Sequence, residues 1–195
     1  MRSLVSWIIP LCFITACQLD GTAATEDLSD GDDAITASNV ALLASPEGSG
    51  PFCRITLAKL APGETQSRVL AHTCAASPGE LANAAVVPAA SVLLMTWYQD
   101  INFGGPSAQL FGSAGPCDAE GYGFSNVGTA WNDRISSFKA FNNCNRAVAF
   151  TNINFGGTSA TYVNAGGVGH TPALSVGFVG TAMNDKISSF LINRQ

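Results

Sequence analysis

The chain has 195 residues, of which 12% are charged, 47% are hydrophobic and 20 are glycine. This composition argues against a disordered chain and favours a turn-rich β protein with one ordinary domain plus accessory segments. The net charge of -5 argues against nucleic acid as a partner, because neutralising phosphates needs clustered Lys and Arg, and the nine basic residues here are dispersed.

Residues 1–16 have the pattern of a signal peptide. Arg2 supplies a positive charge, and the apolar run after it is too short to span a bilayer. The run ends in Ile-Thr-Ala before Cys17, which resembles the lipobox at which bacterial lipoprotein precursors are cleaved. We predict an exported lipoprotein on the cell envelope, held to the membrane through a lipid on Cys17. The alternative is ordinary secretory cleavage after Ala16 or a little later, which releases a free protein.

Residues 17–50 are interpreted as an acidic flexible tether. Positions 18–50 hold seven Asp and Glu residues, no Lys or Arg, and no aromatic residue. Such a segment cannot bury enough apolar surface to offset its ordering entropy. As a random coil it would hold an anchored domain roughly 30 Å from a membrane.

Four cysteines follow the tether: Cys53, Cys74, Cys117 and Cys144. An even number in an exported chain favours two disulfides. The sequence leaves the pairing open, although pairing nearest neighbours along the chain would join Cys53 to Cys74 and Cys117 to Cys144. A zinc site is the alternative, but no closely spaced C-x-x-C pair is present.

Residues 51–92 are predicted to be a disulfide-pinned, hairpin-like extension. Positions 52–57 and 68–74 have patterns typical of strands, and Pro62-Gly63 between them marks a turn. Residues 82–87 fit either a short helix or a third strand, because periodicity does not separate the two.

A tandem repeat occupies the rest of the chain. Residues 101–105 return unchanged as 153–157, and residues 127–138 return as 179–190 with two substitutions, at a constant spacing of 52 residues and without gaps. Such a repeat indicates one structural unit used twice.

Each copy has an all-β pattern. Residues 91–98 and 146–150 lead into Asn-Phe-Gly-Gly, where glycine permits the positive φ of a tight hairpin. Residues 135–141 and 187–192 are rich in β-branched and aromatic residues and are predicted to be the closing strands. Two units of four short strands predict a small β-sandwich.

The repeated Asn-Asp-x-Ile-Ser-Ser loop carries hard oxygen donors. Its polar residues are Asn132, Asp133, Ser136 and Ser137 in the first copy and Asn184, Asp185, Ser188 and Ser189 in the second. Carboxylate, amide and hydroxyl oxygens are calcium ligands rather than zinc or copper ligands. One loop presents about three of them, whereas Ca²⁺ takes six to eight oxygens, so two loops are needed. The alternative is that Asn-Asp only makes a turn and Ser-Ser only enters a strand.

These motifs resemble those of the microbial βγ-crystallin family. Tyr98 and Phe103-Gly104-Gly105 match its aromatic hairpin, and residues 132–137 match its later loop; residues 150–157 and 184–189 match them again. The resemblance implies an all-β, Greek-key β-sandwich over residues 93–195, with motif one at 93–143 and motif two at 144–195. The disulfide-bearing N-terminal β segment departs from the minimal family pattern.

The resemblance also implies two Ca²⁺ sites, each built from both loops. Asp133 and Asp185 would give side-chain oxygens across the motif boundary, Ser136 and Ser188 hydroxyls, and Arg134 and Lys186 backbone carbonyls. The full implied ligand set is Asn132, Asp133, Arg134, Ser136, Asn184, Asp185, Lys186 and Ser188. With about one carboxylate per site, we expect dissociation constants of roughly 10⁻⁵ to 10⁻³ M.

We therefore predict an exported, calcium-stabilised protein that is not an enzyme. His72 and His170 lie in no nucleophilic pattern, and no catalytic or phosphate-binding motif is present. One alternative is a secreted metalloprotease inhibitor of the same fold, whose candidate loop is residues 111–122. Another is a structural envelope or spore-coat protein.

Overall fold

The computed structural model describes residues 50–84, 87–164, 166 and 169–195. The predicted signal peptide, the lipidation site at Cys17 and residues 17–49 of the predicted tether lie outside these residues. No helix in the described ranges is long and apolar enough to cross a membrane.

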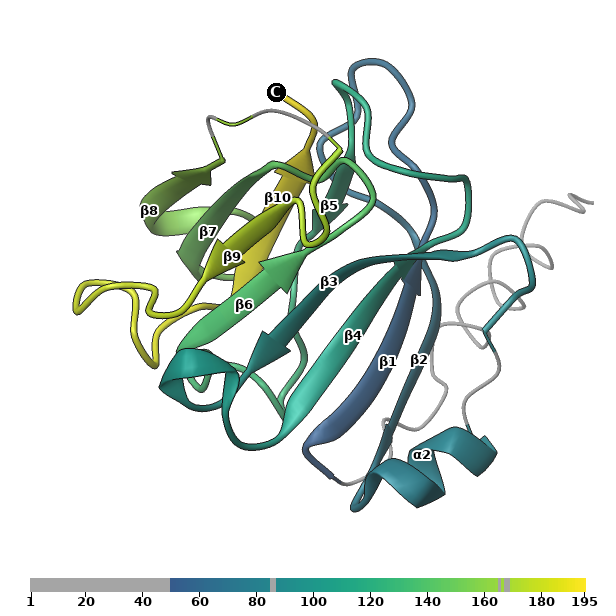
Figure 1. The fold of residues 1–195 in the computed structure, drawn as a ribbon, viewed down its shortest axis with the longest axis vertical. Helices are drawn as coiled ribbons and strands as arrows, with labels where there is room; N and C mark the ends of the chain where they lie inside the picture. Colours follow the sequence, from purple (N-terminus) through teal and green to yellow (C-terminus); the bar gives the residue numbers. More distant parts are fainter. Residues whose placement is uncertain (1–49, 85–86, 165, 167–168) are drawn as a thin grey trace, which may run out of the picture.

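The described residues form two packed β-sheets (Figure 1). The strands are β1 (Phe52–Leu57), β2 (Val69–Ala75), β3 (Val92–Tyr98), β4 (Ser107–Gly112), β5 (Tyr122–Phe124), β6 (Ser137–Ala140), β7 (Arg146–Asn152), β8 (Gly156–Val163), β9 (Leu174–Val176) and β10 (Ser189–Asn193). One sheet has the order β2-β1-β4-β3-β6-β9, and the other has the order β5-β10-β7-β8. The predicted all-β sandwich is confirmed.

Each repeat contributes four strands, and its third strand lies in the sheet of the other repeat. Strands β3, β4 and β6 share one sheet with β9, while β7, β8 and β10 share the other with β5. Both exchanged strands pair antiparallel with the closing strand of the opposite repeat, β5 with β10 and β9 with β6. The two copies therefore interlock, and neither sheet is complete without both.

The N-terminal hairpin extends the first sheet. Strands β1 and β2 pair antiparallel, with Cys53 opposite Cys74, and these two residues form a disulfide. Strand β1 also pairs in parallel with β4. A short helix, α2 (Pro78–Ala84), follows β2, so the structure has a helix at 82–84, where the sequence allowed a helix or a strand.

The core is a cluster of aromatic side chains between the sheets. Trp97 is fully buried and packs against Phe124 and Phe190 at centroid distances of 6.1 and 5.9 Å. Trp131 meets Trp97 edge-on at 6.2 Å. Since these residues come from both repeats, burial of apolar surface holds the interlocked strands together.

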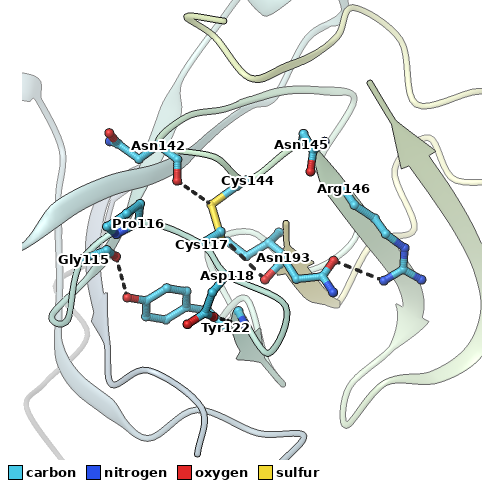
Figure 2. The surroundings of a disulfide bond; sticks show 12 residues. Gly115, Pro116, Cys117, Asp118, Tyr122, Asn142, Cys144, Asn145, Arg146 and Asn193 are labelled. Carbon is cyan, nitrogen blue, oxygen red and sulfur yellow. Dashed lines mark hydrogen bonds between the residues drawn. A yellow bond between two sulfur atoms is a disulfide. The ribbon is translucent and has the colours of Figure 1, made fainter. Parts of the chain in front are cut away.

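A second disulfide joins Cys117 to Cys144 (Figure 2). It links the segment between β4 and β5 to the start of the second repeat. All four cysteines after the tether are therefore paired in disulfides, which leaves no free thiolate among them for the alternative zinc site.

Candidate metal site

Each Asn-Asp loop is a tight turn closed by its own backbone. The amide of Asn132 donates to the carbonyl of Gly128 at 2.9 Å, and that of Asn184 donates to Gly180 at 2.9 Å. Asp133 and Asp185 then adopt left-handed conformations, with φ of 58° and 55°. Asn and Asp tolerate this region better than other non-glycine residues, because their short side chains hydrogen-bond locally. The turn leaves both carboxylates on the surface.

The two loops lie against each other. The amide of Asp133 donates to the carbonyl of Ile187 at 3.3 Å, and the amide of Asp185 donates to that of Ile135 at 3.4 Å. The carbonyls of Ser136 and Ser188 accept from the opposite repeat as well, each at 3.0 Å. The predicted site residues of one copy are therefore brought next to those of the other.

Asp185 contacts the first repeat through its side chain. The hydroxyl of Ser136 donates to Oδ1 of Asp185 at 3.2 Å. The amide Nδ2 of Asn184 donates to Oδ2 of the same carboxylate at 2.6 Å. The remaining oxygen of Asn184, Oδ1, is buried without a hydrogen-bond partner among the described residues. An unpaired buried acceptor beside a carboxylate and a hydroxyl is an arrangement that suits a cation.

The arrangement around Asp133 differs in one contact. Nδ2 of Asn132 donates to Oδ2 of Asp133 at 2.8 Å, as in the other copy. The hydroxyl of Ser188, however, donates to the carbonyl of Thr151 at 2.9 Å instead of to a carboxylate. The two predicted sites share a backbone frame; they differ in the orientation of one serine and in the buried, unpartnered Oδ1, which is found at Asn184 and not at Asn132.

The basic side chains at the predicted carbonyl ligands are exposed. The guanidinium of Arg134 donates to Oε1 of Gln99 at 2.9 Å and to the carbonyl of Ala130 at 3.3 Å. Lys186 is exposed at the matching position. Within the described residues the one ion pair joins Lys59 to Asp118, so neither loop carboxylate is neutralised by a cationic side chain.

The second serine of each Ser-Ser pair has a role that the sequence did not reveal. Ser137 is fully buried; its hydroxyl donates to the carbonyl of Asp100 at 2.6 Å and accepts from the amide of Phe103 at 3.0 Å. Ser189 makes the same two bonds to Asn152 and Phe155, at 2.7 and 3.1 Å. These serines hold the aromatic hairpins, so they are not among the oxygens available to a metal. The sequence does contain a pattern that could have indicated this contact, because the serine follows the phenylalanine by 34 residues in both copies.

The segment between β4 and β5, within the candidate inhibitory loop, is held at several points (Figure 2). The hydroxyl of Tyr122 donates to the carbonyl of Gly115 at 2.7 Å, and Lys59 pairs with Asp118 at 2.7 Å. Partial burial alone would raise the pKa of Asp118, but hydrogen bonds from Lys59 and the Gly121 amide outweigh it and lower that pKa. These contacts identify no protease, and inhibition stays a prediction.

Comparison with known proteins returns βγ-crystallin domains. No family model matches the chain, and no curated protein sequence matches it. A double mutant of a βγ-crystallin domain from Clostridium beijerinckii is 30% identical over 51% of this chain and 96% of that chain, with a TM-score of 0.37. A clostrillin double mutant in complex with nickel, with two serines changed to histidine, is 28% identical over 51% of this chain and 97% of that chain, with a TM-score of 0.37. A βγ-crystallin domain from Flavobacterium johnsoniae is 22% identical over 52% of this chain and 96% of that chain, with a TM-score of 0.35.

The interlocked repeats define a two-motif Greek-key sandwich. With 30% identity across 96% of a clostridial domain and both motif signatures present, the chain belongs to a microbial βγ-crystallin-like family. The resemblance found in the sequence is thereby confirmed.

Proposed function

We propose that this protein binds two Ca²⁺ ions at the paired Asn-Asp loops, and that calcium stabilises the interlocked sandwich. The hydrogen bond between Ser136 of the first repeat and Asp185 of the second carries the proposal, because it places a hydroxyl and a carboxylate from different repeats at one point. An ion held there would bridge the repeats. Its binding free energy would then add to the stability of the folded chain.

The side chains of the loops offer the oxygen donors that calcium prefers. One site would use Asp185, Ser136 and the unpartnered Oδ1 of Asn184, together with backbone carbonyls. The other would use Asp133 and Ser188 once its hydroxyl turns from Thr151. The loops contain no histidine or cysteine. Their donors are therefore oxygens, the ligands of Ca²⁺ rather than of zinc or copper.

We also propose that the protein is exported and that it is not an enzyme. Export, with an anchor at Cys17 or free secretion, is supported by the signal-like N-terminus and by the two disulfides. A calcium ion in these loops would act as a structural staple, and we propose no catalytic role for the protein.

Calorimetric titration with Ca²⁺ tests the proposal. We expect weak binding at two sites, with dissociation constants of roughly 10⁻⁵ to 10⁻³ M. Asp185→Asn should weaken one site and Asp133→Asn the other, because each substitution removes the only carboxylate of its site. Asp118→Asn is the matched control, since it removes a carboxylate outside the loops that already pairs with Lys59.

The three variants distinguish calcium binding at the loops from weak attraction of Ca²⁺ to any surface carboxylate. Weakening of one of the two sites in each loop variant, with both sites retained in Asp118→Asn, is the expected result. Absence of binding heat in the unchanged chain, or equal losses in all three variants, would rule out sites at these loops.

A further inference from the structure

The two repeats differ in what covers their outermost strands. With the 52-residue spacing, β4 of the first repeat corresponds to β8 of the second. Each pairs on its inner side with the first strand of its own repeat, β4 with β3 and β8 with β7. The two edges are therefore equivalent positions of one structural unit.

The N-terminal extension covers the edge in the first repeat. Strand β1 pairs in parallel with β4 over five residue pairs, Cys53–Ala108 to Leu57–Gly112. The segment after β1 also covers β5, where the amide of Ser67 donates to the carbonyl of Gly123 at 2.8 Å. A Cβ atom at Gly123 would overlap the carbonyl oxygen of Thr65, so this approach requires glycine. The unit thus accepts an added strand at this position without a change in its own pairing.

The equivalent edge of the second repeat is open. Strand β8 ends its sheet, and no strand other than β7 pairs with it in the described part of the chain. It lies on the side of the molecule away from the β1–β2 hairpin (Figure 1). An unpaired strand edge exposes a row of backbone donors and acceptors that can template pairing with another strand.

Strand β8 lacks the features that usually protect such an edge. It has eight residues, the greatest length among the described strands, and its sequence GGTSATYV contains no charged residue and no proline. Ser159 and Thr161 are exposed, and Val163 is 42% exposed. Natural edge strands are commonly short, or carry lysine or proline to prevent pairing.

We propose that β8 is a dimerisation edge that pairs antiparallel with β8 of a second copy of this chain. A two-fold axis across the strand would join the two four-stranded sheets into one sheet of eight strands. A second copy is the occupant that fits best, because antiparallel pairing of identical strands closes symmetrically and needs no other component. The absence of charge on β8 means that the pairing opposes no like charges.

The other sheet edges do not offer the same surface. Strands β5 and β9 have three residues each, and β5 is covered by the extension. Strand β2, at the far edge of the first sheet, also has no proline and no Asp, Glu, Lys or Arg, but α2 packs against it; it carries Leu70 with 43% exposure. Leu70 therefore supplies a control position on a competing edge.

Sedimentation velocity over a range of concentrations tests the proposal on the full chain. The chain is expressed with export, so that the disulfides form, and carries Cys17→Ser to remove any lipid. Three variants are compared in this background: Thr161→Lys adds a charge to β8, Thr161→Val keeps a β-branched uncharged residue there, and Leu70→Lys adds a charge to β2. Circular dichroism establishes that each variant is folded.

We expect a concentration-dependent dimer that Thr161→Lys weakens on the order of tenfold or more, while Thr161→Val and Leu70→Lys leave it intact. Amide hydrogen exchange of residues 157–163 should slow as the dimer forms. A chain that stays monomeric at several hundred micromolar, or a dimer that Leu70→Lys breaks and Thr161→Lys does not, would overturn the proposal. Unchanged exchange in β8 on dimer formation would also overturn it.

Discussion

Two adjacent serines in each repeat are engaged in different ways, although both are buried. Ser136 directs its hydroxyl to the carboxylate of Asp185 in the opposite loop, whereas Ser188 directs its hydroxyl to the carbonyl of Thr151 on β7. Ser137 and Ser189 face the opposite way and hold the aromatic hairpins, where Phe103 and Phe155 adopt positive φ of 66° and 60°. A phenylalanine in this region is strained, so the serine bonds are what maintain the hairpin geometry.

We predict that Ser137→Ala and Ser189→Ala each lower the free energy of unfolding by about 1–3 kcal/mol. Each change removes two part-buried hydrogen bonds and leaves a backbone amide and a backbone carbonyl without their side-chain partner. Urea denaturation measures the loss. The control is Ser175→Ala, because Ser175 is exposed on β9. Losses in the two hairpin variants no larger than that of the control would show that these serines do not hold the hairpins.

We predict that the hydroxyl of Tyr162 makes the folded chain less stable at alkaline pH. Burial raises the pKa of Tyr162 to about 12, and its hydroxyl donates to the carbonyl of Val179 at 2.7 Å. The folded state therefore holds this proton more tightly than the unfolded state, whose pKa is about 10. The resulting stabilisation is complete below pH about 10 and disappears as the pH rises toward 12. In urea denaturation at several pH values, Tyr162→Phe should reduce the fall in stability over this window; an identical fall in both proteins would contradict the assignment.

The N-terminal hairpin is part of the sandwich rather than an appendage. Ile55 and Leu57 of β1 are fully buried and belong to the same core cluster as Trp97 and Phe190. The predicted boundary near residue 92 therefore separates segments of sequence that share one core.

We predict that a chain beginning at residue 91 is much less stable than one beginning at residue 50. Removing the hairpin uncovers β4 and exposes apolar side chains that β1 buries, each contributing roughly 1.5–3 kcal/mol. Thermal unfolding followed by circular dichroism compares the two chains. Equal melting temperatures would show that residues 93–195 form an independent domain.

The strands that could be predicted are those with a local pattern. Positions 52–57 alternate, and β1 spans the same residues. The exchange of β5 and β9 between sheets could not be predicted, because three residues carry too little periodicity and hydrophobic pattern does not name a strand's partner. The parallel pairing of β1 with β4 was missed for the same reason.

The loops of the candidate site were predicted because both copies keep the same polar residues at the same spacing. The direction of each hydroxyl was not predictable. Ser136 and Ser188 are equivalent in sequence, yet one donates to a carboxylate and the other to a backbone carbonyl. Their side-chain rotamers depend on neighbours from the opposite repeat, which sequence spacing does not define.

Several constraints join the two repeats. Strands β5 and β9 are exchanged, the aromatic core spans both sheets, and Cys117–Cys144 links the first repeat to the start of the second. The disulfide closes a loop of 27 residues and contributes about 3–4 kcal/mol in the chain-entropy model. Calcium at the paired loops would add a further constraint at the surface between the repeats.

The melting temperature with and without calcium tests whether calcium at the paired loops stabilises the folded chain. At a free Ca²⁺ concentration about 100 times the dissociation constant, each site should contribute roughly 2.7 kcal/mol. Two sites should therefore raise the melting temperature on the order of 10 °C relative to a chelator. Asp133→Asn and Asp185→Asn should each remove part of that rise. A melting temperature that is the same in chelator and at this Ca²⁺ concentration would contradict the claim that the paired loops bind calcium.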